Sequence, residues 1–176
     1  LDERLFATPA LAVERARAQT MEMANLARST MLQAMSLVHH WDSDMARQIS
    51  ANEDQTDSYE DRLGTYLVRL SSHTLSVEDS HSVSVLLHTI GDFERIGDHA
   101  VNLLDSAREL HSKGLVLPEN TRSELSVLES AVQEILNNSI ESFQHADLEL
   151  ARKVEPLEDT IDDLVREMKN RHIQRL

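Results

Sequence analysis

The chain contains no cysteine among its 176 residues. Disulfides, thiolate metal sites and thiol catalysis are therefore excluded, and any bound metal would need oxygen or imidazole ligands. Glycine and proline are scarce, with four and three residues, and aromatic side chains make up only 3 % of the chain. Because turns and strands depend on these residue types, the composition favours a protein built from long helices.

The sequence also lacks long apolar runs and an excess of positive charge. No apolar run approaches the roughly 20 residues that span a bilayer, and the first residues show no signal-peptide pattern. The formal net charge of -14 repels phosphate backbones and anionic lipid, so no nucleic-acid partner is expected. We therefore expect a soluble, cytoplasmic chain. It opens on "LDERLF" and ends on "NRHIQRL", which suggests a fragment of a longer protein.

Apolar periodicity and capping residues predict five helical segments. They cover residues 9–38, 43–72, 77–110, 118–144 and 147 to the C-terminus. The predicted start signals are Thr8 with Pro9, Asp42 or Ser43, Ser76 with Asp79, and Asp147. Pro156 is expected to kink the last helix or to mark its true start. Long helices with short connections predict an all-α antiparallel bundle.

An internal repeat divides the chain. Residues 39–57 align without a gap with residues 144–162, at an offset of 105 residues. The identical pairs are His40 and His145, Asp42 and Asp147, Ala46-Arg47 and Ala151-Arg152, Glu53-Asp54 and Glu158-Asp159, and Asp57 and Asp162. A period that holds three helices predicts a duplicated three-helix unit. The first unit covers residues 11–112, and the second, residues 113–176, lacks its third helix.

Three of the helices carry the pattern Glu-x-x-x-Asp. The pairs are Glu53/Asp57, Glu94/Asp98 and Glu158/Asp162. At about 100° per residue, each Glu falls within the apolar stripe of its helix and each Asp lies about 40° away, at the edge. A buried carboxylate must be protonated, paired or bound to a cation, and few basic residues lie near these stripes. Facing pairs from two helices would form an oxygen-rich cation site.

Simpler interpretations stay open. In a chain with 31 acidic residues, the pairs could be surface residues at the margin of the apolar stripe, in a plain interaction bundle. His81, His88, His99 and Asp92 share another face, which could bind metal or sense pH, although a solvated polar face explains them more simply. Glu78-x-x-His81 is half of a di-iron oxidase signature, but a carboxylate-bridged metalloenzyme needs two copies. No nucleophile or Gly-rich phosphate loop appears, so the chain is not expected to be an enzyme.

The stretch "FERIGDHAVNL" (93–103) resembles the signature helix of PhoU proteins, whose pattern is close to Glu-Arg-Ile-x-Asp-His-x-x-Asn. The matching residues are Glu94, Arg95, Ile96, Asp98, His99 and Asn102. The pairs at 53/57 and 158/162 are similar to the other motif helices of that family. The opening "LDERLFATPALAVERA" resembles the segment that joins the membrane part of bacterial sodium/phosphate cotransporters to a C-terminal PhoU domain.

The resemblance implies a regulatory role in phosphate transport and phosphate homeostasis. It favours the cytoplasmic portion of a sodium/phosphate cotransporter, tethered to the inner face of the membrane, with residues 1–10 as a linker from an upstream membrane region. The alternative is a free-standing PhoU-like negative regulator of phosphate uptake and phosphate-starvation signalling. Either way, the expected partner is a membrane phosphate transporter, in the first case part of the same polypeptide. A homodimer is also considered, because the missing helix leaves an apolar groove.

The resemblance also implies a multinuclear cluster of iron or zinc. The ligands that it suggests in the first unit are Glu53, Asp57, Glu94 and Asp98. Glu158 and Asp162 would be the ligands in the second unit. Because the second signature helix is missing from the sequence, a complete second cluster is not expected in this chain alone.

Overall fold

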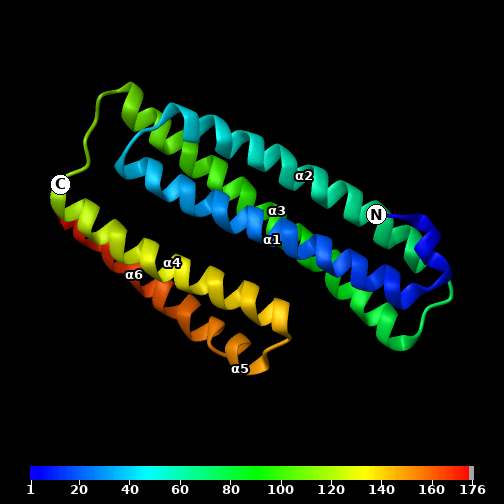
Figure 1. The fold of residues 1–176 in the computed structure, drawn as a ribbon. Helices are drawn as coiled ribbons and strands as arrows, with labels where there is room; N and C mark the ends of the chain where they lie inside the picture. The colour runs from blue at the N-terminus through cyan, green and yellow to red at the C-terminus, as the bar shows by residue number, and fades with distance from the viewer. Residues whose placement is uncertain (175–176) are drawn as a thin grey trace. The chain divides into compact units, whose positions relative to one another are not determined.

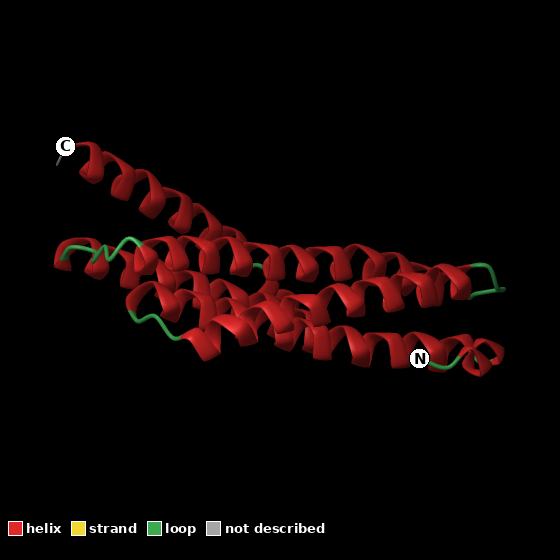
Figure 2. Ribbon diagram, turned by 90° about the horizontal axis from the view of Figure 1, so that it is seen from above, coloured by secondary structure: helices red, strands yellow, loops and turns green. Residues whose placement is uncertain are grey.

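The computed structural model of the chain describes residues 1–174, which form helices and loops without any strand (Figure 2). The helices are η1 (Glu3–Ala7), α1 (Pro9–His39), α2 (Ser43–Ser71), α3 (Val77–Ser112), α4 (Glu119–His145), α5 (Leu148–Ala151) and α6 (Val154–Gln174). The all-α class predicted from the sequence is therefore confirmed. The chain divides into two compact units, unit 1 (Leu1–Glu109) and unit 2 (Leu110–Leu176).

Unit 1 is a bundle of three long helices, α1, α2 and α3, which lie side by side (Figure 1). Small and large apolar residues alternate in the core between them. One core cluster consists of Ala34, Leu37, Ala46, Ile49, Ala100, Leu104 and Ala107. Alanine lets helix backbones approach closely, and each fully buried leucine or isoleucine contributes about 1.5–3 kcal/mol relative to an exposed one. This core holds α2 and α3 against each other.

Side-chain caps fix where α2 and α3 begin. The carboxylate of Asp42 accepts hydrogen bonds from the backbone N–H groups of Asp44 and Met45. At the start of α3, the Ser76 hydroxyl accepts from the backbone N–H of Asp79 at 3.0 Å and donates to its carboxylate at 2.7 Å. Each cap satisfies N–H groups that have no partner within the helix. Both start signals predicted from the sequence are thus confirmed, with Asp42 rather than Ser43 as the cap of α2.

The start of α1 differs from the prediction. Thr8 makes no side-chain cap hydrogen bond, although its carbonyl accepts the N–H groups of Leu11 and Ala12. Pro9 occupies the first helical position, where its missing N–H costs nothing and its fixed φ suits the helix. Proline, rather than a threonine cap, therefore begins this helix.

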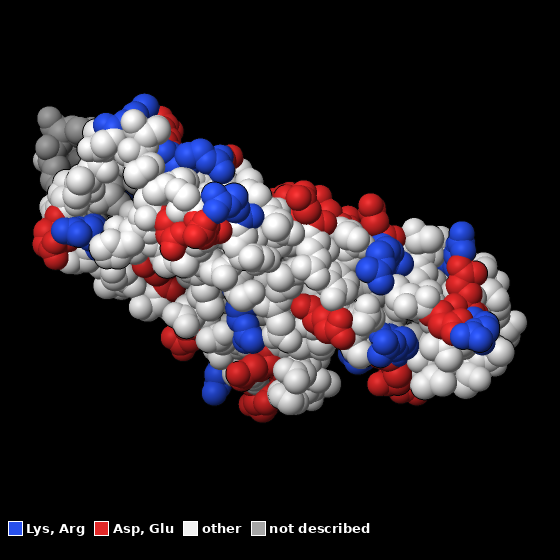
Figure 3. Space-filling view, turned by 45° about the horizontal axis from the view of Figure 1, so that its top comes forward, with Lys and Arg blue, Asp and Glu red and all other residues white. Residues whose placement is uncertain are grey.

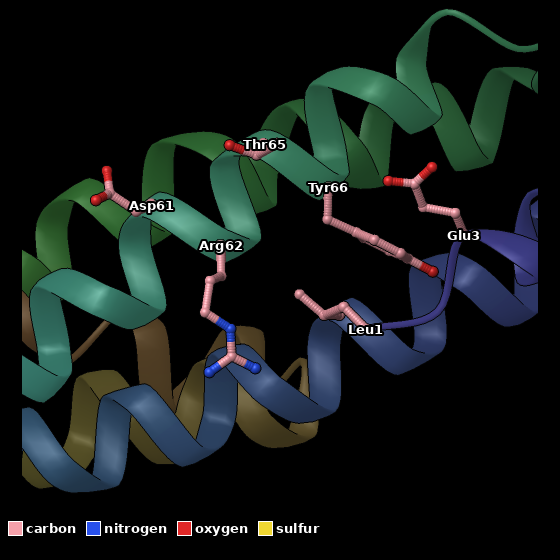
Figure 4. Close-up of a pocket in the computed structure, with 6 residues that line it drawn as sticks. All are labelled: Leu1, Glu3, Asp61, Arg62, Thr65 and Tyr66. Atoms are coloured by element: carbon pink, nitrogen blue, oxygen red, sulfur yellow. The ribbon is translucent and has the colours of Figure 1, made fainter.

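The residues before α1 fold against α2. Phe6 of η1 is buried, and its ring centroid lies 4.9 Å from that of Tyr66 and 5.0 Å from that of His73. Arg69 forms an ion pair with Glu3. Figure 4 shows Tyr66 reaching toward the N-terminal segment, beside a hollow of about 370 Å³. Part of the segment expected to be a linker, residues 3–7, is therefore packed on α2.

Unit 2 consists of α4, α5 and α6. Ala146, with a left-handed φ of 50°, ends α4, and the Asp147 carboxylate caps α5 by accepting the N–H of Leu150 at 3.0 Å. The helix predicted from Asp147 onward is interrupted at residues 152–153, just before α6 begins at Val154. Pro156 thus sits in the first turn of α6, where proline is tolerated, and not within a continuous helix.

The two units differ in how much they bury. Among the described residues of unit 2, only Ile140 is buried, whereas unit 1 has buried residues along all three long helices. Within residues 1–174, every helix is too short or too polar to cross a lipid bilayer.

Candidate functional site

Three carboxylates of unit 1 converge between α2 and α3. Oxygen atoms of Glu53 and Asp57 on α2 and of Asp98 on α3 all lie within 4.8 Å of one another. Among the residues that the structure describes, no other group of three or more His, Cys, Asp or Glu side chains is arranged in this way. These three residues are called the carboxylate cluster below. The two sequence pairs 53/57 and 94/98 therefore face each other through three of their four members.

A glycine brings the two helices together at the cluster. Gly97 is buried, and a Cβ atom at this position would lie 3.6 Å from Cγ2 of Thr56 and 3.9 Å from Cγ of Glu53. Without a side chain, the backbone of α3 rests directly on these α2 side chains. Because Asp98 follows Gly97, the close approach carries its carboxylate toward the pair on α2.

A polar network next to the cluster connects α1 to α2. The buried side-chain amide of Asn52 donates to Oε1 of Gln33 at 3.3 Å and accepts from Gln48 at 2.7 Å. The Thr56 hydroxyl donates to the Asn52 carbonyl at 2.9 Å. Buried polar groups need such partners. Since Asn52 precedes Glu53, the network also helps to set the rotation of α2 that directs Glu53 toward α3.

Electrostatic repulsion within the cluster is not balanced by basic side chains. Burial raises the pKa of Glu53 above its ordinary value, and the charges of Asp57, Asp54 and Asp98 raise it further. Burial raises the pKa of Asp57 as well, followed by the charge of Asp98. Figure 3 shows Lys and Arg beside Asp and Glu at many points of the visible surface. Within residues 1–174, however, none of these ion pairs includes a member of the cluster, so a cation could neutralise it.

Glu94 and Glu60 extend the acidic surface. Burial is also the main cause that raises the pKa of the Glu94 carboxyl, followed by the charges of Asp98, Glu60 and Asp57 and a hydrogen bond with the Asp98 side chain. Oε1 of Glu60 lies 4.0 Å from where a Cβ of Gly91 would be. Glu60 was not among the predicted ligands, although its helical phase, about 20° from Glu53, is a signal that could have found it.

The carboxylates occupy the margin of the buried stripe, not its centre. The buried positions around the signature of α3 are Ile90, Phe93, Gly97 and Ala100. Their mean direction lies about 80° from that of Glu94, which is only half-buried. Leu87 and Val101, which lie within about 20° of Glu94 around the helix, are also only half-buried, whereas Gly97 and Ala100 are buried. The carboxylates therefore line a seam that solvent and ions can reach.

The other predicted candidates are not assembled into a group. Glu158 and Asp162 are both exposed on α6, and among the described residues no further acid or histidine joins them in a metal-binding arrangement. His81, His88 and His99 are exposed along α3 and lie outside the carboxylate cluster.

The raised pKa values predict an unusual pH dependence of stability in the metal-free chain. Ordinary carboxyl groups titrate near pH 4. Between that pH and their raised pKa values, the carboxyl groups of Glu53, Asp57 and Glu94 bind more protons in the folded state than in the unfolded state. The free energy of unfolding therefore increases as the pH falls through the raised values toward the ordinary carboxyl range. We expect a higher melting temperature near pH 5 than near pH 7, measured by circular dichroism in the presence of a chelator.

The double variant Glu53→Gln/Asp57→Asn separates this effect from the general relief of negative charge on acidification. Without the two carboxyl groups, its melting temperature should change less between the same pH values and should be higher than that of the native chain near pH 7. A native chain whose stability falls steadily on acidification over this range would contradict the prediction.

Comparison with known proteins assigns the sequence to a family. The sequence model of the PhoU domain matches residues 20–107 and residues 125–176. A phosphate-specific transport system accessory protein PhoU homolog from Aquifex aeolicus is 24 % identical over 157 residues, which cover 89 % of this chain and 70 % of that protein. The homolog from Clostridium acetobutylicum is 21 % identical over 160 residues, covering 90 % of this chain and 72 % of that protein.

PhoU of Escherichia coli K12 is 28 % identical over 102 residues, which cover 57 % of this chain and 42 % of that protein. No solved structure gives a significant match. The first matched range contains all three members of the carboxylate cluster as well as Glu94, and the second contains the pair on α6. With most of its residues matched by this one domain, the chain belongs to the PhoU family.

Proposed function

We propose that the chain is a PhoU-type regulatory domain that controls phosphate transport by binding rather than by catalysis. The observation that carries this proposal is the match of the PhoU domain to residues 20–107 and 125–176. It is supported by relatives that are named accessory proteins of phosphate-specific transport systems and that align with up to 90 % of the chain. The proposed partner is a membrane phosphate transporter, engaged on the cytoplasmic side.

The relatives favour one of the two forms of this role. Each of the relatives described above is named an accessory protein, not a transporter, so a free-standing negative regulator of phosphate uptake and phosphate-starvation signalling is the better-supported form. The cytoplasmic domain of a sodium/phosphate cotransporter stays a prediction, which rests on the resemblance of the first residues. Joining to a membrane domain would make the regulator and the transporter one polypeptide.

We also propose that the carboxylate cluster binds iron. The fit rests on its donors, since three carboxylates from two helices offer only oxygen and lack any basic partner. Such donors suit hard ions, whereas structural zinc sites consist mainly of cysteine and histidine ligands. Of the two metals that the family resemblance suggests, iron is therefore the better match. A bound cation would supply positive charge that neutralises the cluster and crosslinks α2 to α3. Glu94 and Glu60 offer further oxygens for a second ion.

A transport assay in living cells tests the regulatory role. The full chain would be expressed in a bacterial strain that lacks its own PhoU gene, and uptake of radioactive phosphate would be measured. We expect uptake to fall when the native chain is present. The double variant Glu53→Gln/Asp98→Asn should leave uptake near the level of the deletion strain, because it lacks two of the three ligands through which a cation would join α2 to α3.

The variant Asp92→Asn is the matched control. Asp92 is an exposed acid on α3, like Asp98, but it pairs with Arg95 and is not part of the carboxylate cluster. It should restrain uptake like the native chain. If the native chain left uptake unchanged at normal expression levels, the regulatory role would be refuted in that host. Equal restraint by the native chain and the cluster variant would refute only the part assigned to the cation.

A further inference from the structure

Unit 1 has a second feature that the proposed role leaves unused, a hollow of about 480 Å³ along α2 and the C-terminal part of α3. Its polar and aromatic lining consists of Trp41, Ser43, Arg47, Ser50, Asp54 and Arg108. None of these residues belongs to the carboxylate cluster. The volume lies within the range of pockets that hold small organic ligands. We call it the Arg47–Arg108 hollow.

Short side chains on one face of α2 make this hollow. Ser43, Ala46 and Ser50 recur at spacings of three and four residues, so they share a helix face, and they line the hollow together with Ala51. Ala46 is buried and belongs to the core cluster, so it forms part of the floor. Trp41 lies in the connection between α1 and α2, and the other lining residues stand on the packed helices α2 and α3.

Two arginines line the hollow in a chain that is acidic as a whole, and each of them also pairs with an aspartate of its own helix. The chain has 17 basic and 31 acidic residues, yet two arginines and one aspartate line this surface. Arg108 pairs with Asp105 at 2.6 Å and Arg47 pairs with Asp44, each within its own helix. Exposed pairs of this kind contribute only about 0–1 kcal/mol, and a guanidinium has five N–H donors. Both side chains can therefore also bind an anion.

Phosphate is the anion whose geometry suits this pair best. Its oxygens accept parallel hydrogen bonds from a guanidinium, which is why arginine is favoured for phosphate recognition. The hydroxyls of Ser43 and Ser50 supply further donors at the same surface. The carboxylate of Asp54 can only accept hydrogen bonds when ionised, so it would favour a ligand that also carries hydroxyl or amino donors over a bare, highly charged anion.

Trp41 adds a flat apolar surface in the connection just before α2. Its indole N–H donates to the Ser43 hydroxyl at 3.2 Å, and its ring packs against the core cluster. Both contacts hold the ring in place beside the hollow. Stacking of a nucleic-acid base on an aromatic side chain contributes about 1–3 kcal/mol. The lining thus combines a stacking surface with phosphate-binding groups.

We propose that the Arg47–Arg108 hollow binds a small phosphate ester that carries a flat ring, such as a nucleoside monophosphate. The phosphate lies between the two guanidinium groups, the ring stacks on Trp41, and Asp54 accepts from a hydroxyl or amino group of the ligand. Free phosphate shares the first of these interactions but not the others. The site shares no residue with the carboxylate cluster, although Asp54 is next to Glu53 in the sequence, and it requires no metal.

Isothermal titration of the full chain with adenosine monophosphate tests the proposal. Parallel titrations use adenosine and inorganic phosphate, and a chelator is present throughout. Because Trp41 is the single tryptophan of the chain, its fluorescence reports binding at this site directly. We expect saturable binding of the monophosphate with a change in Trp41 emission, at an affinity at least about tenfold higher than that of either fragment.

The double variant Arg47→Gln/Arg108→Gln should weaken this binding by about tenfold or more. Arg95→Gln is the matched control, because Arg95 has the same ion pair with an aspartate three residues earlier, on α3, but does not line the hollow. Equal affinity of the double variant and the native chain would overturn the proposal. So would binding of inorganic phosphate as tight as that of the ester, or binding that appears only when metal replaces the chelator, since the anion would then sit on a cation.

Discussion

Replacing Asp98 with asparagine is expected to remove most of the iron that we propose to bind at the carboxylate cluster, together with the thermal stabilisation that such binding would give. Asp98 is the only member of the carboxylate cluster on α3, so the change removes the charged ligand through which a cation would join α3 to α2. At a free cation concentration of about 100 times its dissociation constant, binding to the folded state alone adds about 2.7 kcal/mol. For a chain of this length, this corresponds to roughly 5–10 °C in melting temperature.

The measurement is elemental analysis combined with melting curves recorded with iron and with chelator. In Asp98→Asn the difference between the two curves should nearly vanish, whereas in Asp92→Asn it should equal that of the native chain. With chelator alone, Asp98→Asn should melt at or above the native temperature, because one of the mutually repelling carboxylates is gone. Unchanged iron content in Asp98→Asn would refute the cluster as the iron site.

Replacing Gly97 with leucine is expected to destabilise unit 1 by about 1–3 kcal/mol, the usual cost of forcing extra methylene groups into a packed interface. The first added carbon would already touch Thr56 and Glu53 at 3.6–3.9 Å, so the rest of the leucine has no space between α2 and α3. The helices must separate there, which moves Asp98 away from Glu53. Denaturant unfolding should show the lower stability, and iron binding should weaken in parallel.

Gly97→Ala is the control that separates the effect of side-chain size from the effect of replacing glycine in the helix backbone. Its single added carbon would make ordinary van der Waals contacts, and alanine is favoured over glycine within a helix by about 0.5–1 kcal/mol. We therefore expect this variant to be slightly more stable than the native chain and to keep its iron. If alanine proved as damaging as leucine, the helices would have to pack more tightly at Gly97 than the structure indicates.

The helices and their starts could largely be predicted from local signals. Asp42 and Ser76 act as caps through hydrogen bonds to neighbours two or three residues away, and such interactions are encoded in short stretches of sequence. The matched phase of the pairs Glu53/Asp57 and Glu94/Asp98 could also be predicted, since helical rotation is regular. The role of Thr8 was harder to predict. Its hydroxyl can cap the helix only at certain backbone angles, and the residue types alone do not determine those angles.

The parts of the site that depend on contacts between helices could not be predicted in the same way. The burial of Glu94 was overestimated because the prediction followed the large apolar side chains. The buried residues next to it include Gly97 and Ala100, which are too small to mark a hydrophobic stripe. The helical phase of Glu60 indicates the face of α2 on which it lies, but its proximity to Glu94 also depends on the register of α2 against α3. The same holds for the Arg47–Arg108 hollow, whose two arginines are 61 positions apart in the sequence.

The uneven burial of the two units has a consequence for how the chain unfolds. Ile140 is the only buried residue among those described after residue 109. Unit 2 therefore has few buried side-chain contacts that must break together when it unfolds. Its amide hydrogens should therefore exchange with solvent through local openings of low free energy, while those in the middle of α1, α2 and α3 await cooperative opening of unit 1. A cation at the cluster would slow exchange in unit 1 and leave the rates in unit 2 unchanged.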